Sequence, residues 1–514
     1  MSALADVQTV LTAAESLFGR VVGTAGGAGS YTFARWIFLR SLGAVFLVAF
    51  LSLWVQVEGL LGEDGVLPAG EYLDTLRVRS EGVDLVRAPT IFWWAGGDGA
   101  LHAACAAGTA LSLALAVGLA PPLALAGLWA LYLSFAAVGR VFLSYQWDVL
   151  LLEASFLGIF LAPWGLATGP LSAAPDPAVP AAALFAAWWL LFRLVFQSGV
   201  GKLTSGDPAW RDLSALEYHW WTQPLPTWTA WWAARLPRWC HRAATAATHV
   251  LEIAVPLMIF GPREIRIAGF AGIVLLQVVI ALTGNYNFFN LLTVALAFLL
   301  LDDAAWAGLL GDGAVAVATE GAAAPAVQSA AAAAVAVGSL AASLPHVWRT
   351  LFPDRPLPAV VQAATRRLAP FRTINSYGLF RVMTRRRPEI VVEGSRDGET
   401  WRPYRFRWKP CDPRRKPRFC APHQPRLDWQ MWFAALSTFR RSRWMHAFLV
   451  RLLEGSRAVE ALLEEVPYPE EGPTYVRAVL YEYRFADPDE RRRSGRWWTR
   501  ERVGLYAPPV TAEG

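Results

Sequence analysis

The sequence is poor in charged residues. Only 17% of its 514 residues are Asp, Glu, Lys or Arg, whereas about 25% is usual in soluble globular domains. Hydrophobic residues make up 55% of the chain, and the mean hydropathy is +0.33. This composition excludes an ordinary water-soluble protein and indicates that much of the chain is surrounded by lipid.

The sequence also lacks the residue patterns of common catalytic and metal sites. Its four cysteines are too few for a disulfide-rich scaffold. It has no Walker loop, no dinucleotide-binding fingerprint, no His-x-x-x-His or Cys-x-x-Cys pair and no Gly-x-Ser-x-Gly elbow. We therefore expect no metal and no cofactor, and no complete catalytic constellation is visible.

The charge that is present is unevenly placed. Residues 366–514 hold 30 Lys and Arg against 18 Asp and Glu, and the rest of the chain holds 17 against 23. We predict a transmembrane helical bundle over 1–302, an Ala-rich linker over 303–365 that holds a candidate last transmembrane helix, and a basic, β-rich C-terminal domain over 366–514. Nucleic acid is not an expected partner of a basic domain that is tethered to a membrane.

Long apolar runs recur through the first part of the chain. A membrane span needs about 20 mostly apolar residues, and its backbone polar groups have to be bonded within the segment, so these runs are expected to be helices. They fall near 36–57, 101–119, 123–139, 142–163, 181–199, 243–260, 265–283 and 286–301, with an Ala-rich ninth candidate near 325–344. The expected fold is a polytopic α-helical membrane bundle of eight or nine transmembrane helices, followed by an extramembrane domain that mixes β-sheet and α-helix.

The loops indicate how the bundle is oriented. The segment 58–98 contains eight acidic and three basic residues, and the turn between the sixth and seventh spans carries Arg263 and Arg266. The positive-inside rule places the first segment outside and the second in the cytoplasm. Nine spans then put the C-terminal domain outside and eight put it inside; we favour nine.

The loop 199–242 is rich in tryptophan, and its seven Trp residues are Trp210, Trp220, Trp221, Trp228, Trp231, Trp232 and Trp239. Trp rings favour the level of the lipid headgroups. We expect this segment to lie on the membrane surface, partly as an amphipathic helix.

The pattern changes to alternating polar and apolar residues after about Phe371, as expected for strands. Strands are predicted at 389–393, 404–408, 475–485 and 497–506, the last two as partners, and helices at 429–438 and 444–463. The basic charge of this domain has three interpretations: solvated strand faces, contact with anionic headgroups, or a docking surface for a client protein.

Several polar residues fall in or beside the predicted spans, where ionisable groups are costly and are functional candidates by default. They are Arg140, Asp148, Glu153, Arg193, His249, Glu252, Asn285 and Asn290. One interpretation is a set of internal ion pairs, for instance Glu153 with Arg193. The alternative is catalysis by Lys202, a base whose pKa is lowered by burial, with His219 as its neighbour in space.

Cys411 and Cys420 bracket a loop rich in Pro and Arg. Outside the cytosol the simplest interpretation is a structural disulfide, worth about 2–3 kcal/mol. A redox-exchanging pair is an alternative, and in the cytosol the two would be free thiols.

Three motifs resemble the signatures of the lipase maturation factor family. They are Arg140-Val-Phe-Leu-Ser-Tyr-Gln-Trp-Asp148-Val-Leu-Leu-Leu-Glu153, Gly284-Asn-Tyr-Asn-Phe-Phe-Asn290 and Ala421-Pro-His-Gln-Pro-Arg-Leu-Asp-Trp-Gln-Met-Trp-Phe433. The resemblance runs over nearly the whole chain, in order. It implies a polytopic protein of the endoplasmic reticulum membrane that helps dimeric lipases to fold and assemble, with a lumenal C-terminal domain that contacts the client.

The resemblance makes client-binding candidates of His423, Arg426, Asp428, Trp429 and Trp432. The Ala-rich, Arg-over-Lys composition favours a bacterial member of the family, for which the cell membrane and the periplasm would replace the endoplasmic reticulum and its lumen. The expected partners are a lipase-like client protein and membrane lipid. The leading prediction is therefore a membrane-bound maturation factor, not an enzyme.

A second, weaker similarity covers the second to sixth spans. Gly199-Val-Gly-Lys202-Leu, Trp210 and Tyr218-His219-Trp220 look like the membrane region of the vitamin K-dependent γ-carboxylases. It implies the alternative function, an integral-membrane enzyme of the quinone-oxidising type that uses Lys202 as its base.

Overall fold

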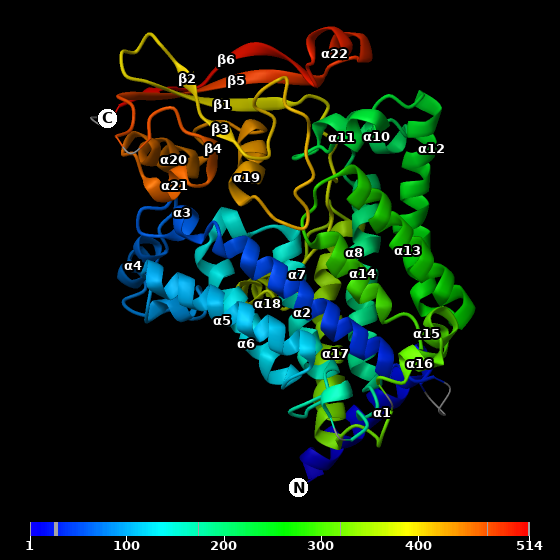
Figure 1. The fold of residues 1–514 in the computed structure, drawn as a ribbon. Helices are drawn as coiled ribbons and strands as arrows, with labels where there is room; N and C mark the ends of the chain where they lie inside the picture. The colour runs from blue at the N-terminus through cyan, green and yellow to red at the C-terminus, as the bar shows by residue number, and fades with distance from the viewer. Residues whose placement is uncertain (1, 25–28, 173, 319, 470, 512–514) are drawn as a thin grey trace.

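The computed structural model describes residues 2–24, 29–172, 174–318, 320–469 and 471–511. A bundle of long helices carries a sheet-containing C-terminal domain at one end, and the sheet is the layer farthest from the bundle (Figure 1). The helices α19, α20 and α21 lie between the sheet and the bundle. The predicted fold class, a polytopic helical membrane protein with a mixed C-terminal domain, is confirmed.

Within the described residues, seven helical segments are long and apolar enough to cross a membrane. They are α2 Thr32–Trp54, α5 Asp98–Val117, α6 Pro121–Val138, α8 Ala181–Thr204, the segment Arg238–Phe260, α13 Arg263–Thr283 and α17 Ala326–Leu351. An eighth is reached if α14 Phe289–Phe298 and α15 Asp303–Leu310, bent by 111° to each other, are one span. The Ala-rich ninth candidate is thus a helix of full length.

The span predicted near 142–163 differs from this expectation. It is α7 Gln146–Leu161, with 16 residues, which is shorter than a full span of about 20 residues. Most of α7 is buried inside the bundle. Polar groups at its start hold it there, as described below.

Shorter helices complete the bundle and its connections. They are α1 Ser2–Val22, α3 Val57–Leu61, α4 Ala69–Arg79, α9 Pro208–Arg211, α10 Ala215–Thr222, α11 Trp228–Ala233, α16 Asp312–Val315 and α18 Ala359–Leu368, with single 3₁₀ turns η2 Ile91–Trp93, η3 Arg140–Leu143, η4 Gly169–Leu171 and η7 Ala369–Phe371. The segment Arg238–Phe260 is itself composite: α12 Arg238–His249 continues as the π-helix η5 Val250–Ala254 and the 3₁₀ helix η6 Val255–Phe260.

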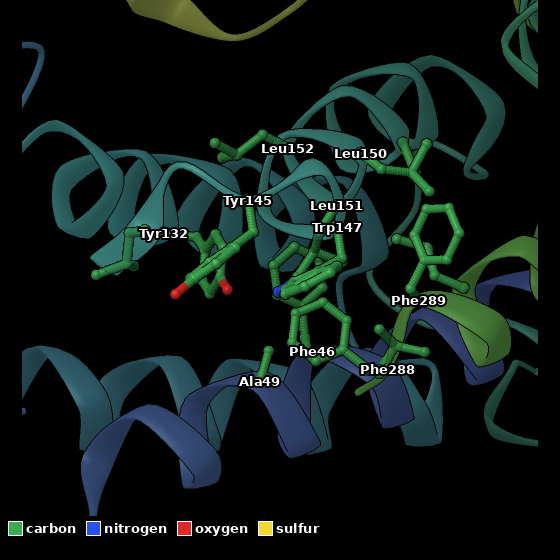
Figure 2. Packing of buried hydrophobic residues seen from close by; sticks show 14 of the residues in the cluster. Phe46, Ala49, Tyr132, Tyr145, Trp147, Leu150, Leu151, Leu152, Phe288 and Phe289 are labelled. Carbon is green, nitrogen blue, oxygen red and sulfur yellow. The ribbon is translucent and has the colours of Figure 1, made fainter. Parts of the chain in front are cut away.

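The core of the bundle is aromatic and aliphatic. Phe46 and Ala49 of α2 face Trp147 and Leu151 of α7, and Phe288 joins them from the start of α14 (Figure 2). All five are buried. Because lipid is as apolar as these side chains, close packing and internal hydrogen bonds hold such helices together.

The C-terminal domain contains a four-stranded antiparallel sheet in the order β2-β1-β5-β6. Its strands are β1 Pro388–Ser395, β2 Arg402–Pro403, β5 Tyr475–Phe485 and β6 Trp498–Val510, and a second sheet pairs β3 Arg405–Phe406 with β4 Leu463–Glu465. The predicted pairing of the last two strands is confirmed, with Phe485 opposite Trp498. The helices are α19 Arg426–Ala435, α20 Arg443–Leu453, α21 Arg457–Glu460 and α22 Pro488–Ser494.

The helix predicted over 444–463 is wrong beyond Leu453. Gly455 adopts a left-handed conformation with φ of +64°, which ends helices and favours glycine. A short helix and the strand β4 follow.

The Trp-rich loop 199–242 packs partly on protein, and its predicted place on the membrane surface stays a prediction. It folds into α9, α10, α11 and the start of α12, and Trp210, Trp220 and Trp231 are buried within the protein. Trp231 donates a hydrogen bond to the Ala486 carbonyl and packs on Trp497. The C-terminal domain therefore packs on part of this loop.

Candidate functional site

The contact between the bundle and the C-terminal domain is built on buried charges. Arg426, at the start of α19, donates two hydrogen bonds to Asp148 of α7, at 2.9 and 3.0 Å. Tyr132 of α6 donates to the same carboxylate at 2.6 Å. The Arg426 and Asp148 side chains are 1% and 0% exposed. A bidentate Arg–carboxylate pair of this kind fixes orientation as well as distance.

The residues before Arg426 enter the bundle beside this pair. The Gln424 backbone N–H donates to the Ser52 hydroxyl at 2.8 Å, and Gln56 donates to the Gln424 carbonyl at 2.8 Å. Trp147 of α7 hydrogen-bonds the Gln424 side chain. His423 lies 2.9 Å from the Ser52 hydroxyl. Residues 423–426 thus form a plug, held between α2 and α7.

A second buried group lies deeper in the bundle. Glu153 of α7 pairs with Arg193 of α8, which confirms the predicted ion pair. The same carboxylate accepts hydrogen bonds from the Asn375 backbone N–H at 2.9 Å and from the Tyr377 hydroxyl at 2.7 Å. Glu153 therefore also holds the chain that leads into the C-terminal domain.

A third group attaches the sheet to the Trp-rich loop. Arg387, just before β1, pairs with Glu389 at 2.7 Å, and Lys409 pairs with the same carboxylate at 2.9 Å. Arg387 also donates to the carbonyls of Trp221 and Pro224 at 2.9 and 2.8 Å. All three charged side chains are buried, and removing one partner of such a group costs several kcal/mol.

Asn285 forms the fourth attachment. Its side-chain amide donates to the carbonyls of Leu225 and Arg418 at 3.0 and 2.9 Å, and its oxygen accepts from the Cys420 N–H at 2.8 Å. The Gly284–Asn290 motif therefore meets the loop that leads into residues 421–433. At the far end of the motif, Asn290 stays inside the bundle and donates to Gln277 at 2.9 Å.

These contacts bear on the predicted client-binding residues. Arg426, Asp428, Trp429 and Trp432 are buried, and His423 is half-buried in the plug. Asp428 accepts hydrogen bonds from the Trp408 and Lys409 N–H groups, both at 2.8 Å. Four of the five side chains thus act inside the molecule, and direct client contact by this set stays a prediction.

Two pKa shifts follow from the burial of this segment. Burial, and then the nearby Arg426 guanidinium, lower the pKa of His423 to about 4, so its ring is neutral at pH 7. Burial raises the pKa of Asp428 to about 6, although the backbone N–H groups of Lys409 and Trp408 favour the charged form.

Cys411 and Cys420 are free, buried thiols in the structure. Burial raises the pKa of both, so they are protonated at neutral pH and are poor nucleophiles. This argues against the redox-exchanging interpretation. The predicted disulfide is not formed here and stays a prediction.

Lys202 forms an ion pair that was not predicted from the sequence. Its ammonium lies 2.6 Å from Glu252 of η5, and both side chains are nearly inaccessible. Gly199 makes this possible, because a Cβ atom there would lie 2.7 Å from the Cβ of Glu252. The Lys202 nitrogen is engaged by this carboxylate, whereas a catalytic base has to face the proton that it removes from its substrate. The geometry therefore does not support the catalytic interpretation of Lys202.

His219 lines the same cavity as Lys202 and Glu252. Burial, and then the nearby Lys202, lower the pKa of His219 to about 4. The His219 ring, like that of His423, is therefore neutral at pH 7. Its Nε2 lies 3.3 Å from the hydroxyl of Tyr286. His219 and Lys202 are thus close in space, as predicted. Among the hydrogen bonds of the described residues, none joins the two side chains directly.

The remaining candidates have local roles. Arg140 lies in η3, between α6 and α7, with its guanidinium 5.0 Å from the ring centre of Tyr72. His249 contacts the Trp210 carbonyl through Nε2 at 3.0 Å. His249 ends α12 and Glu252 lies in η5, and each has its own partner.

The comparisons with known proteins cover both parts of the chain. Residues 33–308 match the family model of the lipase maturation factor transmembrane domain, and residues 373–508 match that of the lipase maturation factor C-terminal domain. The chain belongs to the lipase maturation factor family. The predicted family is confirmed, and the similarity to γ-carboxylases stays a prediction.

Individual members of the lipase maturation factor family match over nearly the full length. Lipase maturation factor 2 of Homo sapiens is 38% identical over 93% of this chain and 82% of its own. Lipase maturation factor 1 of Bos taurus is 35% identical over 95% of this chain and 90% of its own. No solved structure matches the chain.

Several residues of the contact between the bundle and the C-terminal domain were not predicted from the sequence. Ser52 and Gln56 lie one helical turn apart, in or beside the first apolar span. Two polar residues at this spacing share one face of a helix, and this could have marked them as a polar contact. Arg387, Glu389 and Lys409 looked like the solvated charges of a basic domain. Asn375 and Tyr377 gave no signal, because their importance depends on Glu153, 222 and 224 positions away.

Proposed function

We propose that this chain is a membrane-bound maturation factor that assists the folding or assembly of secreted lipases by binding them, not by catalysis. The carrying observation is the match to both domains of the lipase maturation factors, which together extend over most of the chain. The enzyme alternative has no support from these comparisons, and the Lys202–Glu252 pair argues against a lysine base.

The proposal includes the side of the membrane on which the client is met. The C-terminal domain contacts the acidic segment 58–98: Arg451 donates to the carbonyls of Glu63 and Gly65, both at 3.0 Å. The positive-inside rule places that segment away from the cytoplasm. We therefore place the domain in the lumen of the endoplasmic reticulum or, for a bacterial host, in the periplasm.

The outer edge of the sheet is the proposed client-binding surface. β6 is the last strand in the sheet order and lies at the side farthest from the bundle (Figure 1). Its backbone pairs with β5 on one side only among the described residues. An unpaired strand edge adds an extended segment of another chain through main-chain hydrogen bonds. A lipase that has not finished folding exposes such segments.

The side chains of β6 suit this partner. Val503 and Leu505 of β6 are 60% and 51% exposed, and Val503 lies at an irregularity in the pairing with β5. The exposed Arg502 adjoins Val503 in the strand, and the exposed Arg492 and Arg496 lie in α22 and just before the start of β6. The buried residues 423–432 serve client binding indirectly in this proposal, because they fix the orientation of the domain that carries β6.

Capture of a defined lipase tests the proposal. Full-length protein in detergent should retain a tagged secretory lipase during its refolding, and the variant Val503→Asp/Leu505→Asp should retain at least about five-fold less, the loss expected from about 1 kcal/mol of cross-strand contact. Val360→Asp on α18, at a valine that is 80% exposed, is the control. Equal capture by both variants would refute the client edge, and no capture by the wild-type chain would refute the function.

A further inference from the structure

A cavity lies within the bundle, and Leu379 and Phe380, of the segment that leads into the C-terminal domain, also line it. Its volume is about 330 Å³, and it is enclosed by α8, α10, α12 with η5, α13 and α14. Most of its walls are apolar, among them Leu194, Leu216, Leu251, Leu276, Ile280 and Phe289. An apolar cavity with a few converging polar groups is the usual form of a small-molecule site.

The cavity reaches the outer surface of the bundle. Leu275 and Val279 of α13 line it, yet Leu275 is 56% exposed and Val279 is also exposed on the outer face. α13 is long and apolar enough to cross a membrane, so we expect this face to contact acyl chains. A lipid therefore has a route into the cavity that does not pass through water.

Its polar groups gather toward one end. Lys202 lies in the last turn of α8, and the ring of Tyr286 packs on Phe380, in the segment that leads into the C-terminal domain. His219 of α10 joins them from the Trp-rich loop. The other walls, such as Leu194 of α8, are mostly apolar, and the polar Gln277 and Thr293 among them are already hydrogen-bonded to Asn290 and to the Phe289 carbonyl. The cavity thus suits an amphiphilic molecule whose polar head group points toward the C-terminal domain.

The polar end carries no net charge. Lys202 and Glu252 neutralise each other at 2.6 Å. His219 is neutral, as argued above. The Tyr286 hydroxyl donates to Gln223 at 3.1 Å and lies 3.3 Å from His219 Nε2, and the second lone pair of its oxygen can accept from a ligand. An ionic head group would bring an unbalanced charge into this buried place, which is costly. A hydroxyl or an ester carbonyl would not.

We propose that this cavity binds one single-chain lipid whose head group is neutral and forms hydrogen bonds, of the monoacylglycerol type. The volume argues for a single chain, because about 330 Å³ is near the lower end of small-molecule sites, about 300–1,000 Å³. The site stands apart from the client-binding edge, and its failure would leave the proposed function untouched.

Photolabelling of the full-length protein tests the site. A monoacylglycerol that carries a diazirine in its chain is added to the protein in nanodiscs, and the labelled peptides are identified by mass spectrometry. Labels are expected on α12 and α13. Excess unlabelled monoacylglycerol should remove most of the label, whereas a fatty acid, which is anionic, should compete at least about ten-fold less well.

Two variants close the mouth of the cavity without disturbing the core. Ala247→Trp on α12 and Leu275→Trp on α13 change lining residues that are already exposed, so the fold is expected to tolerate them. Each should lower labelling at least about five-fold. Val278→Trp, on the same helix and 46% exposed but outside the lining, is the matched control and should label like the wild type.

The polar end is tested by Tyr286→Phe, which removes one hydrogen-bonding hydroxyl. The competing affinity of monoacylglycerol should fall about five-fold, the effect expected of one hydrogen bond, whereas that of a plain hydrocarbon of equal length should not change. Labelling that spreads over all helices, equal labelling of both mouth variants and the control, or equal competition by the fatty acid would each overturn the proposal.

Discussion

Buried polar side chains in this protein act as fasteners between parts of the chain that are far apart in sequence. Asp148 and Arg426 are 278 positions apart and meet at 2.9 Å. Glu153 is 222 positions from Asn375 and accepts two hydrogen bonds from it. A buried carboxylate with two or three such donors is satisfied, whereas one that loses its cation is an uncompensated charge.

Arg426→Met tests this role. The substitution keeps much of the side-chain volume but leaves Asp148 without its cation, so the free energy of unfolding is expected to fall by about 3–5 kcal/mol, measured by chemical denaturation in detergent. Asp148→Asn in the Arg426→Met background should recover part of the loss, because it removes the unpaired charge.

The exposed Arg396–Glu471 pair supplies the control, since both its side chains are more than half exposed. Arg396→Met should cost less than about 1 kcal/mol, as surface pairs do. A loss in Arg426→Met no larger than in this control would show that the buried pair does not hold the domain.

The sequence indicated which polar residues to suspect but only some of their partners. Glu153 and Arg193 could be paired because both stand in long apolar runs, where a lone charge is implausible. Arg426 lies in a domain full of arginines, and nothing local marks it as the one that is 1% exposed. Its partner is determined by tertiary contact alone.

At the scale of elements, close approach between α8 and η5 determines where Lys202 and Glu252 meet. Gly199 faces η5 with no room for a side chain. The π-helical turn rotates Glu252 relative to an α-helix that continues from His249, and π-bulges are frequent at functional positions. The sequence predicted the helix but not this turn, because no residue type there specifies it.

Gly199→Ala tests this arrangement. The added Cβ would lie 2.7 Å from side-chain atoms of Glu252 and Ile253, so η5 has to move away, at an expected cost of about 1–3 kcal/mol in the free energy of unfolding. The melting temperature in detergent measures it. Gly338→Ala on α17, where a Cβ would meet nothing within 4 Å, should change stability by less than about 1 kcal/mol. Equal melting temperatures of both variants would contradict the close packing.

At the scale of the whole molecule, hydropathy alone predicted the membrane bundle, and alternation predicted the long strands β1, β5 and β6. The short span α7 was not foreseen, because its boundaries depend on contacts with α6 and the plug and not on its own composition. The seating of the C-terminal domain on the Trp-rich loop was also missed, because a Trp that packs on protein and a Trp that packs on headgroups look alike in sequence.

On this account, the membrane bundle holds the edge strand β6 at one end, where β6 binds lipases during their maturation. The most direct measurement is the activity of a secreted lipase in the medium of cells that lack their own lipase maturation factor and express this chain. Wild-type protein and Val360→Asp should restore active lipase. Val503→Asp/Leu505→Asp should insert into the membrane equally well and restore at most about a fifth of it. Full restoration by the edge variant, or none by the wild type, would contradict the account.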